Sequence, residues 1–197
     1  MLAAILRRMP GIEIVGVADR STASMGEKIG KTKVITTIGK LSGLLKAGVT
    51  WAALGIGDNK ERAKMFAALR SRGFRILTAC HPTAIVEDDV RIGCGAVICP
   101  GAILCTEVVV GPNALINTGA IVEHESRVGA HAHVGPGCRV AGRVVIGAGT
   151  FLGVGCTVRD GVRIGAGSVI GAGSVVVSDI PSRVVAYGVP AKVQRHV

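Results

Sequence analysis

The sequence predicts a mainly β fold, a parallel β-helix of six-residue repeats preceded by a small α/β domain, and three observations support this. From Ala84 to Asp179 the chain divides into sixteen consecutive units of six residues without an insertion. The composition, with 29 Gly but only three Phe, one Tyr and one Trp, suits short strands and tight corners. Before the repeat, predicted strands alternate with predicted helices, which is typical of a parallel α/β unit.

The repeat has one aliphatic and one small residue in fixed places of each unit. The first place holds only Ala, Ser, Thr, Cys or Val, and Gly fills the fourth place in eight units. We expect the first and third places to line a narrow interior and the glycines to form corners. Three units then make an 18-residue coil whose strands pair with those of the next coil. The third place is always Val, Ile or Leu: Val86, Ile92, Ile98, Leu104, Val110, Ile116, Val122, Val128, Val134, Val140, Ile146, Leu152, Val158, Ile164, Ile170 and Val176.

The six cysteines show no CxxC pair and no metal-finger spacing. Cys138 and Cys156 both occupy the first place of a unit and lie 18 residues apart. We therefore expect them to stack inside one wall, where they serve packing rather than redox chemistry.

Residues 1–80 form the predicted N-terminal domain, and residues 81–197 the β-helix with its C-terminal cap. Within the first domain the pattern predicts helices at 2–9, 41–47 and 60–71 and strands at 12–19, 51–56 and 74–77. Such a unit normally begins with a strand and a Gly-rich turn, whereas this sequence starts inside the first helix. We therefore expect a shortened nucleotide-binding domain, or a sequence that begins late.

Gly57, Asp58 and Asn59 stand between a predicted strand and the helix that follows it. The carboxyl end of a strand that meets a helix N-terminus is a common place for phosphate contact. An ordinary turn with a helix N-cap explains the same three residues equally well.

The net charge of +10 is concentrated in residues 1–83, which carry 14 Lys/Arg against 5 Asp/Glu. A basic domain suits an anionic ligand such as a nucleotide diphosphate, although a solvated basic surface explains the charge as well. Nucleic acid is disfavoured, because no basic stripe alternates with aromatic residues. We expect no membrane span and no secretory signal, and hence a cytoplasmic protein.

The whole chain resembles the sugar O- and N-acyltransferases of the sialic-acid O-acetyltransferase and bacillosamine N-acetyltransferase type. The resemblance is carried by the stretch from Asn117 through Glu125 and on to Gly142, by Gly57-Asp58-Asn59-Lys60 with Arg62, and by the closing Gly188-Val189-Pro190-Ala191-Lys192. It implies a left-handed β-helix, a small Rossmann-like domain, acetyl-CoA as cosubstrate, and a homotrimer with its active sites between neighbouring subunits.

The resemblance implies that His124 is the general base that deprotonates the acceptor amine or hydroxyl. His124 stands at the fifth place of its unit, at a corner, and an imidazole accepts protons near neutral pH. Glu125 would fix its tautomer and stabilise the imidazolium. The alternatives are an exposed corner histidine and a solvated carboxylate.

Four further residues complete the expected site. The resemblance implies that His133 contacts the acyl donor or the base and that Gly142 contacts acetyl-CoA. Asn117 and Asp19 would contact the sugar nucleotide together with Gly57, Asp58 and Asn59. Gly142 lies one coil after His124, so the two should stack on one corner. Arg159, Arg163 and Lys192 are candidate partners for CoA phosphates, although solvated charges explain them nearly as well.

The resemblance, closest in the stretch from Asn117 to Glu125, implies acetyl-CoA-dependent N-acetylation of an amino sugar nucleotide, with O-acetylation of a sugar or sialic acid as the alternative. A non-catalytic β-helix scaffold remains a further alternative. A metal enzyme is disfavoured, because His124, His131 and His133 do not have the five-residue spacing that such β-helix sites use. We expect no metal.

Overall fold

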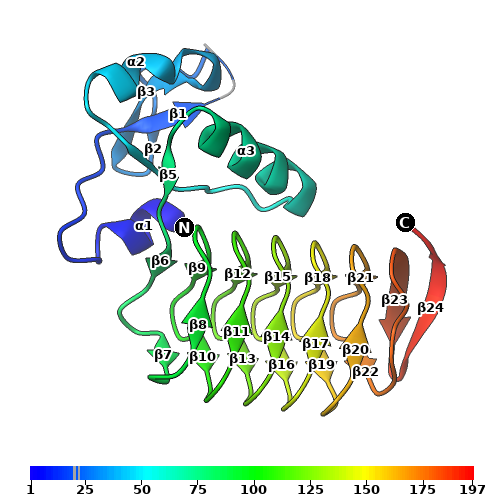
Figure 1. Cartoon of the computed structure of the whole chain (residues 1–197). Helices are drawn as coiled ribbons and strands as arrows, with labels where there is room; N and C mark the ends of the chain where they lie inside the picture. Colours follow the sequence, from blue (N-terminus) through cyan, green and yellow to red (C-terminus); the bar gives the residue numbers. More distant parts are fainter. Residues whose placement is uncertain (20, 22) are drawn as a thin grey trace.

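The structure is a computed structural model that describes residues 1–19, 21 and 23–197. Figure 1 shows a prism of stacked coils, with the N-terminal α/β part lying over its first coils and a hairpin at its far end. The predicted fold class is confirmed in both parts. The hand of the helix follows from the resemblance stated above.

Three parallel sheets form the walls of the prism. The eight-stranded wall contains β6 (Ala79–Cys80), β9 (Val97–Ile98), β12 (Leu115–Ile116), β15 (His133–Val134), β18 (Phe151–Leu152), β21 (Val169–Ile170), β23 (Val184–Gly188) and the antiparallel β24 (Ala191–His196). The six-stranded wall contains β7 (Ile85–Val86), β10 (Ile103–Leu104), β13 (Ile121–Val122), β16 (Arg139–Val140), β19 (Thr157–Val158) and β22 (Val175–Val176). The five-stranded wall contains β8 (Arg91–Ile92), β11 (Val109–Val110), β14 (Arg127–Val128), β17 (Val145–Ile146) and β20 (Arg163–Ile164).

The register of these walls has the predicted period of 18 residues. Ile121, for example, pairs with Ile103 in the preceding coil and with Arg139 in the following coil. Third-place residues from Ile98 to Val176 are buried in one continuous core. Val86 and Ile92 are only partly buried, because they lie in the first coil at the open end.

The interior position predicted for Cys138 and Cys156 is confirmed. Both are fully buried in the β-helix core and both are free thiols. Each Sγ donates to a carbonyl at 3.0 Å, Cys138 to Gly153 and Cys156 to Gly171. The pair therefore fills space and satisfies backbone acceptors.

Two places of the repeat favour glycine for different reasons. At the fourth place the coils approach closely, so that a Cβ on Gly147 would lie 2.4 Å from the backbone nitrogen of Ala166. At the sixth place the backbone is left-handed, with φ of 64° at Gly137 and 58° at Glu125. The fourth place is thus limited by space and the sixth by conformation.

The N-terminal part contains shorter elements than the sequence predicts. Only three residues of the predicted strand 12–19 pair, because Ile12 and Ile14 pack against α1 and the first coils instead. The N-terminal elements are α1 (Leu2–Leu6), β1 (Val17–Asp19), β2 (Lys28–Ile29), β3 (Thr32–Thr37), η1 (Ile38–Lys40), α2 (Ser42–Lys46), β4 (Trp51–Ala52), α3 (Asn59–Ser71) and β5 (Arg75–Ile76).

The strands of this part do not form one continuous sheet. β1 pairs in parallel with β3, β3 pairs with β2 in an antiparallel ladder, and β4 and β5 form a separate parallel pair. The strand β3 was not predicted, because its buried face is made by Thr32, Val34 and Thr36, and a sequence pattern counts threonine as polar. Of the described helices, none has the length and apolar character that crossing a membrane requires.

Candidate active site

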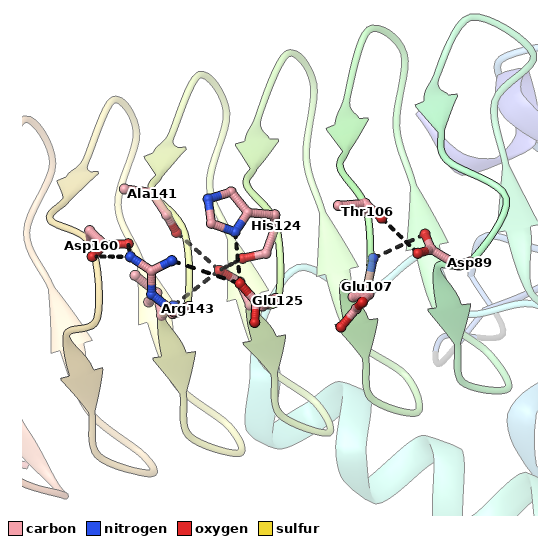
Figure 2. Close-up of polar contacts among 10 residues, drawn as sticks. Asp89, Thr106, Glu107, His124, Glu125, Ala141, Arg143 and Asp160 are labelled. Atoms are coloured by element: carbon pink, nitrogen blue, oxygen red, sulfur yellow. Dashed lines mark hydrogen bonds and ion pairs between the residues drawn. The ribbon is translucent and has the colours of Figure 1, made fainter.

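His124 lies at the turn between β13 and β14, where the six-stranded and five-stranded walls meet (Figure 2). Its Nδ1 lies 3.1 Å from Oε2 of Glu125, and its side chain is 41% exposed. A carboxylate accepts, so Nδ1 carries the proton of the neutral ring and Nε2 is free to accept another. This arrangement is that of a general base with an orienting carboxylate.

Glu125 is held in turn by the next coil. The Nη1 of Arg143 lies 3.7 Å from the same carboxylate oxygen, and the Nη2 of Arg143 lies 2.7 Å from Asp160. Figure 2 shows this chain of contacts running along the corner from His124 to Asp160. The groups are about half exposed, so each pair adds little to stability, but together they restrict where Glu125 points.

Gly142 lies directly against the imidazole of His124, as the 18-residue period predicts. A Cβ on Gly142 would lie 2.5 Å from both Cε1 and Nε2 of His124. The Nε2 of His124 therefore faces backbone without a side chain. The rest of the ring remains partly exposed, which leaves it accessible to a reactant.

Asn117 and His133 form a second polar pair, on adjacent coils of the eight-stranded wall. The Oδ1 of Asn117 accepts from the Thr118 backbone N–H at 2.8 Å, so the amide Nδ2 faces Nε2 of His133 at 3.0 Å. Nε2 must then accept, which places the proton of His133 on Nδ1. The ring also packs edge-on against Phe151, with centroids 5.0 Å apart.

His133 is neutral over the ordinary pH range. Burial, and after it the charge of Arg62, lowers the pKa of His133 to about 4, while the Gly57 carbonyl acts in the opposite direction. The residue is 8% exposed, so its ring is shielded from water. His133 is thus a fixed polar group rather than a proton acceptor for the reaction.

The residues predicted to contact phosphate lie at the start of α3, where Gly57 and Asp58 precede the helix and Asn59 is its first residue. Asp58 is the N-cap of α3 and accepts from the Glu61 backbone N–H at 2.8 Å. Asn59 donates to the carbonyls of Gly149 and Thr150 at 3.0 and 3.1 Å, which ties this loop to the β-helix. The N-cap interpretation of Asp58 is therefore observed, and nucleotide contact by Gly57, Asp58 and Asn59 stays a prediction.

Asp19 ends β1, and its carboxylate accepts from the Ser21 backbone N–H at 2.8 Å. Asn117 follows β12, at the corner between the eight-stranded and six-stranded walls. His124 follows β13, at the next corner, between the six-stranded and five-stranded walls. One chain therefore brings His124, Glu125 and Gly142 together at one corner, and places Asn117 and His133 together on the eight-stranded wall. It does not bring the two groups together.

Comparison with known proteins identifies the repeat and two groups of relatives. Residues 143–178 match the model described as bacterial transferase hexapeptide (six repeats), and residues 83–118 match hexapeptide repeat of succinyl-transferase. PerB from Caulobacter crescentus, solved with CoA and GDP-perosamine, is 41% identical over 86% of this chain and 81% of its own, with a TM-score of 0.83. The acetyltransferase domain of PglB from Neisseria gonorrhoeae, solved with acetyl coenzyme A, is 30% identical over 98% and 91%, with a TM-score of 0.85.

The chain belongs to the hexapeptide-repeat acetyltransferases. WeeI from Acinetobacter baumannii, at 21% identity and a TM-score of 0.83, shares the fold. A comparison with curated proteins finds no match.

Sequence analysis of this acetyltransferase did not assign a role to Arg62, which is 2% exposed. Arg62, Phe66 and Leu69 are the buried residues of α3 and follow a helical spacing of four and three residues. That spacing could have placed Arg62 on the buried face. Arg143 was missed as well, and its position one coil beyond Glu125 was the available clue.

Proposed function

We propose that this hexapeptide-repeat acetyltransferase transfers the acetyl group of acetyl-CoA to the amino group of a nucleotide-linked amino sugar. The relatives support both substrates, since one structure holds CoA with GDP-perosamine and another holds acetyl coenzyme A. A mutant of the perosamine N-acetyltransferase from Caulobacter crescentus, solved with CoA and GDP-perosamine, is 41% identical over 83% of this chain. The basic N-terminal part suits the diphosphate of such a substrate.

The observation that carries the proposal is the geometry of His124, with Nδ1 held by Glu125 and Nε2 free above Gly142. The sugar amine attacks the thioester carbonyl, and Nε2 of His124 removes the proton that the nitrogen loses on forming the N–C bond. The C–S bond then breaks, and the CoA thiolate takes this proton from the imidazolium. Glu125 stabilises the imidazolium while it exists.

The acceptor is positioned by the second polar pair. The Asn117 amide uses one N–H on His133 and keeps the other for an oxygen of the substrate. Asn117 is partly exposed, so its second N–H is accessible. Gly57, Asp58, Asn59 and Asp19 provide the nucleotide-binding part.

Because the two groups lie on different corners of one chain, the active site forms between copies. We infer a homotrimer in which His124, Glu125 and Gly142 of one copy meet Asn117 and His133 of a neighbour. In such an arrangement both groups reach one sugar.

The test is a thiol-release assay with acetyl-CoA and a panel of UDP- and GDP-linked amino sugars, their hydroxyl counterparts, and sialic acid. We expect turnover with an amino sugar nucleotide and an amide in the product by mass spectrometry and NMR. Turnover on a hydroxyl acceptor alone would show O-acetylation instead. Binding of acetyl-CoA without turnover on any acceptor would refute the proposal.

A further inference from the structure

The buried side chain of Arg62 connects the N-terminal part to the wall that carries His133. It belongs to α3 and is 2% exposed, yet no carboxylate among the described residues lies within ion-pairing distance of it. Its guanidinium N–H groups donate to oxygens of neighbouring segments. A buried arginine arranged in this way acts as a rigid fork of donors.

On the N-terminal side, Arg62 holds the loop that was predicted to contact the nucleotide. Its Nη1 donates to the carbonyls of Ile56 and Gly57 at 3.2 and 3.1 Å, and its Nη2 donates to Oδ1 of Asn59 at 2.8 Å. The loop from Ile56 to Asn59 is therefore wrapped around one side chain.

On the β-helix side, the same guanidinium holds the backbone beside His133. Its Nη2 donates to the carbonyls of His131 and Ala132 at 2.9 and 3.3 Å, and its Nε donates to Asn113 at 3.1 Å. The Ala132 carbonyl belongs to the peptide that leads into His133. A shift of Arg62 would therefore move the loop and His133 together.

Arg62 also provides the positive charge that acts on His133. Among the described residues it is the charged group to which His133 responds, and the remaining influences are burial and the Gly57 carbonyl. A second proton on His133 would have to enter at Nε2, the atom that accepts from Asn117. Protonation of His133 and the orientation of Asn117 are thus mutually exclusive.

We propose that Arg62 is a positioning residue for acetyl transfer: its guanidinium fixes the loop from Ile56 to Asn59 together with the backbone that leads into His133, so that the Asn117–His133 pair keeps one orientation beside this buried charge. The proposal rests on the proposed function, because Asn117 matters only if it orients the acceptor. It gives the contacts of Arg62, which join the N-terminal part to the β-helix, a role in the reaction.

The experiment compares Arg62→Lys, which keeps the charge but loses the fork, with Arg62→Gln, which loses both. The pKa of His133 is measured by NMR of its ring nitrogens, with His133→Gln for assignment. We expect Arg62→Gln to raise the His133 pKa by about one pH unit and Arg62→Lys to leave it near the wild-type value. Loosened packing would affect both variants, so their difference isolates the charge.

Steady-state kinetics test whether the contacts of Arg62 with the loop from Ile56 to Asn59 matter for substrate binding. We expect the KM for the sugar nucleotide to rise at least about tenfold in Arg62→Lys, because the loop is no longer held by a bidentate fork, while CoA binding is retained. Asn59→Ala, which removes one tether without a change in charge, should raise this KM without moving the His133 pKa.

Equal His133 pKa values in Arg62→Gln and Arg62→Lys, or a wild-type KM in Arg62→Lys, would overturn the proposal. The lysine variant carries the test alone if the glutamine variant does not fold. If wild-type protein acetylates no sugar nucleotide, the proposed function fails, and the pKa comparison still decides whether Arg62 controls His133.

Discussion

At the scale of single residues, the position of the candidate base His124 depends on the absence of a side chain at Gly142. The His124 imidazole rests where a side chain at 142 would begin, and the backbone of Gly142 is outside the left-handed region. An alanine there is therefore conformationally allowed but must displace His124.

We accordingly expect Gly142→Ala to lower kcat at least about tenfold while leaving the unfolding midpoint close to the wild-type value. The change affects the flexible end of a side chain rather than backbone, so folding tolerates it. Steady-state kinetics and thermal unfolding measure the two quantities. Gly43→Ala, in α2 with no atom within 4 Å of the added Cβ, is the matched control. Wild-type kcat in Gly142→Ala would place the reaction away from His124.

The sequence predicts part of this site because the repeat turns sequence separation into position. His124 and Gly142 lie 18 residues apart, so their contact follows from the period alone. The tautomer of His133 does not follow from the period, because it depends on the Thr118 N–H that orients Asn117 and on the burial of the ring. Nor does the role of Arg62, whose acceptors lie up to 70 residues away.

At the scale of the structural element, the two kinds of corner glycine should respond differently to substitution. The fourth place is limited by the backbone of the next coil, whereas the sixth place requires only a left-handed φ. The chain itself places Glu107, Asn113, His131 and Arg143 at sixth places with φ between 56° and 60°. Asparagine tolerates this conformation well.

We expect Gly147→Ala to destabilise the protein by about 2–3 kcal/mol, because its Cβ would strike the backbone of Ala166. Gly137→Asn should stay within about 0.5 kcal/mol of wild type, because no atom lies within 4 Å of a Cβ there. Urea unfolding at equal protein concentration compares the two variants. Equal losses would mean that space between coils is not what selects glycine at the fourth place.

The elements of the β-helix are predictable and those of the N-terminal part are less so, for one physical reason. Each coil repeats the same contacts, so a wrong position for one unit would have broken the pattern of the other fifteen. In the N-terminal part, by contrast, each strand pairs in its own way, and no repeat indicates its partner. The sequence 12–19 is apolar enough for a strand, yet Ile12 and Ile14 find apolar neighbours in α1 and the first coils. Tertiary packing therefore decides how much of it pairs.

At the scale of the whole molecule, a single chain keeps the two groups of proposed site residues apart. His124, with Glu125 and Gly142, lies where the six-stranded wall meets the five-stranded wall. Asn117 lies where the eight-stranded wall meets the six-stranded wall, and His133 lies beside it on the eight-stranded wall. If neighbouring copies complete each site, an inactive variant of one half should complement an inactive variant of the other.

We expect a mixture of His124→Ala and His133→Ala chains, unfolded and refolded together, to recover a fraction of wild-type acetylation that neither variant shows alone. Mixed trimers contain some interfaces at which both intact halves meet. Light scattering should give three copies per particle. Refolding each variant separately and then mixing is the control. No recovery from co-refolded chains would mean that each site is formed within one chain.

The central claim, acetyl transfer with His124 as base, is tested most directly by the turnover number of His124→Asn with the preferred sugar nucleotide. Asparagine keeps a polar side chain of similar reach but cannot accept the proton. We expect kcat to fall about 10²- to 10⁴-fold, with CoA affinity unchanged by calorimetry. A kcat within a few-fold of wild type, at unchanged CoA affinity, would contradict the account and show that another group removes the proton.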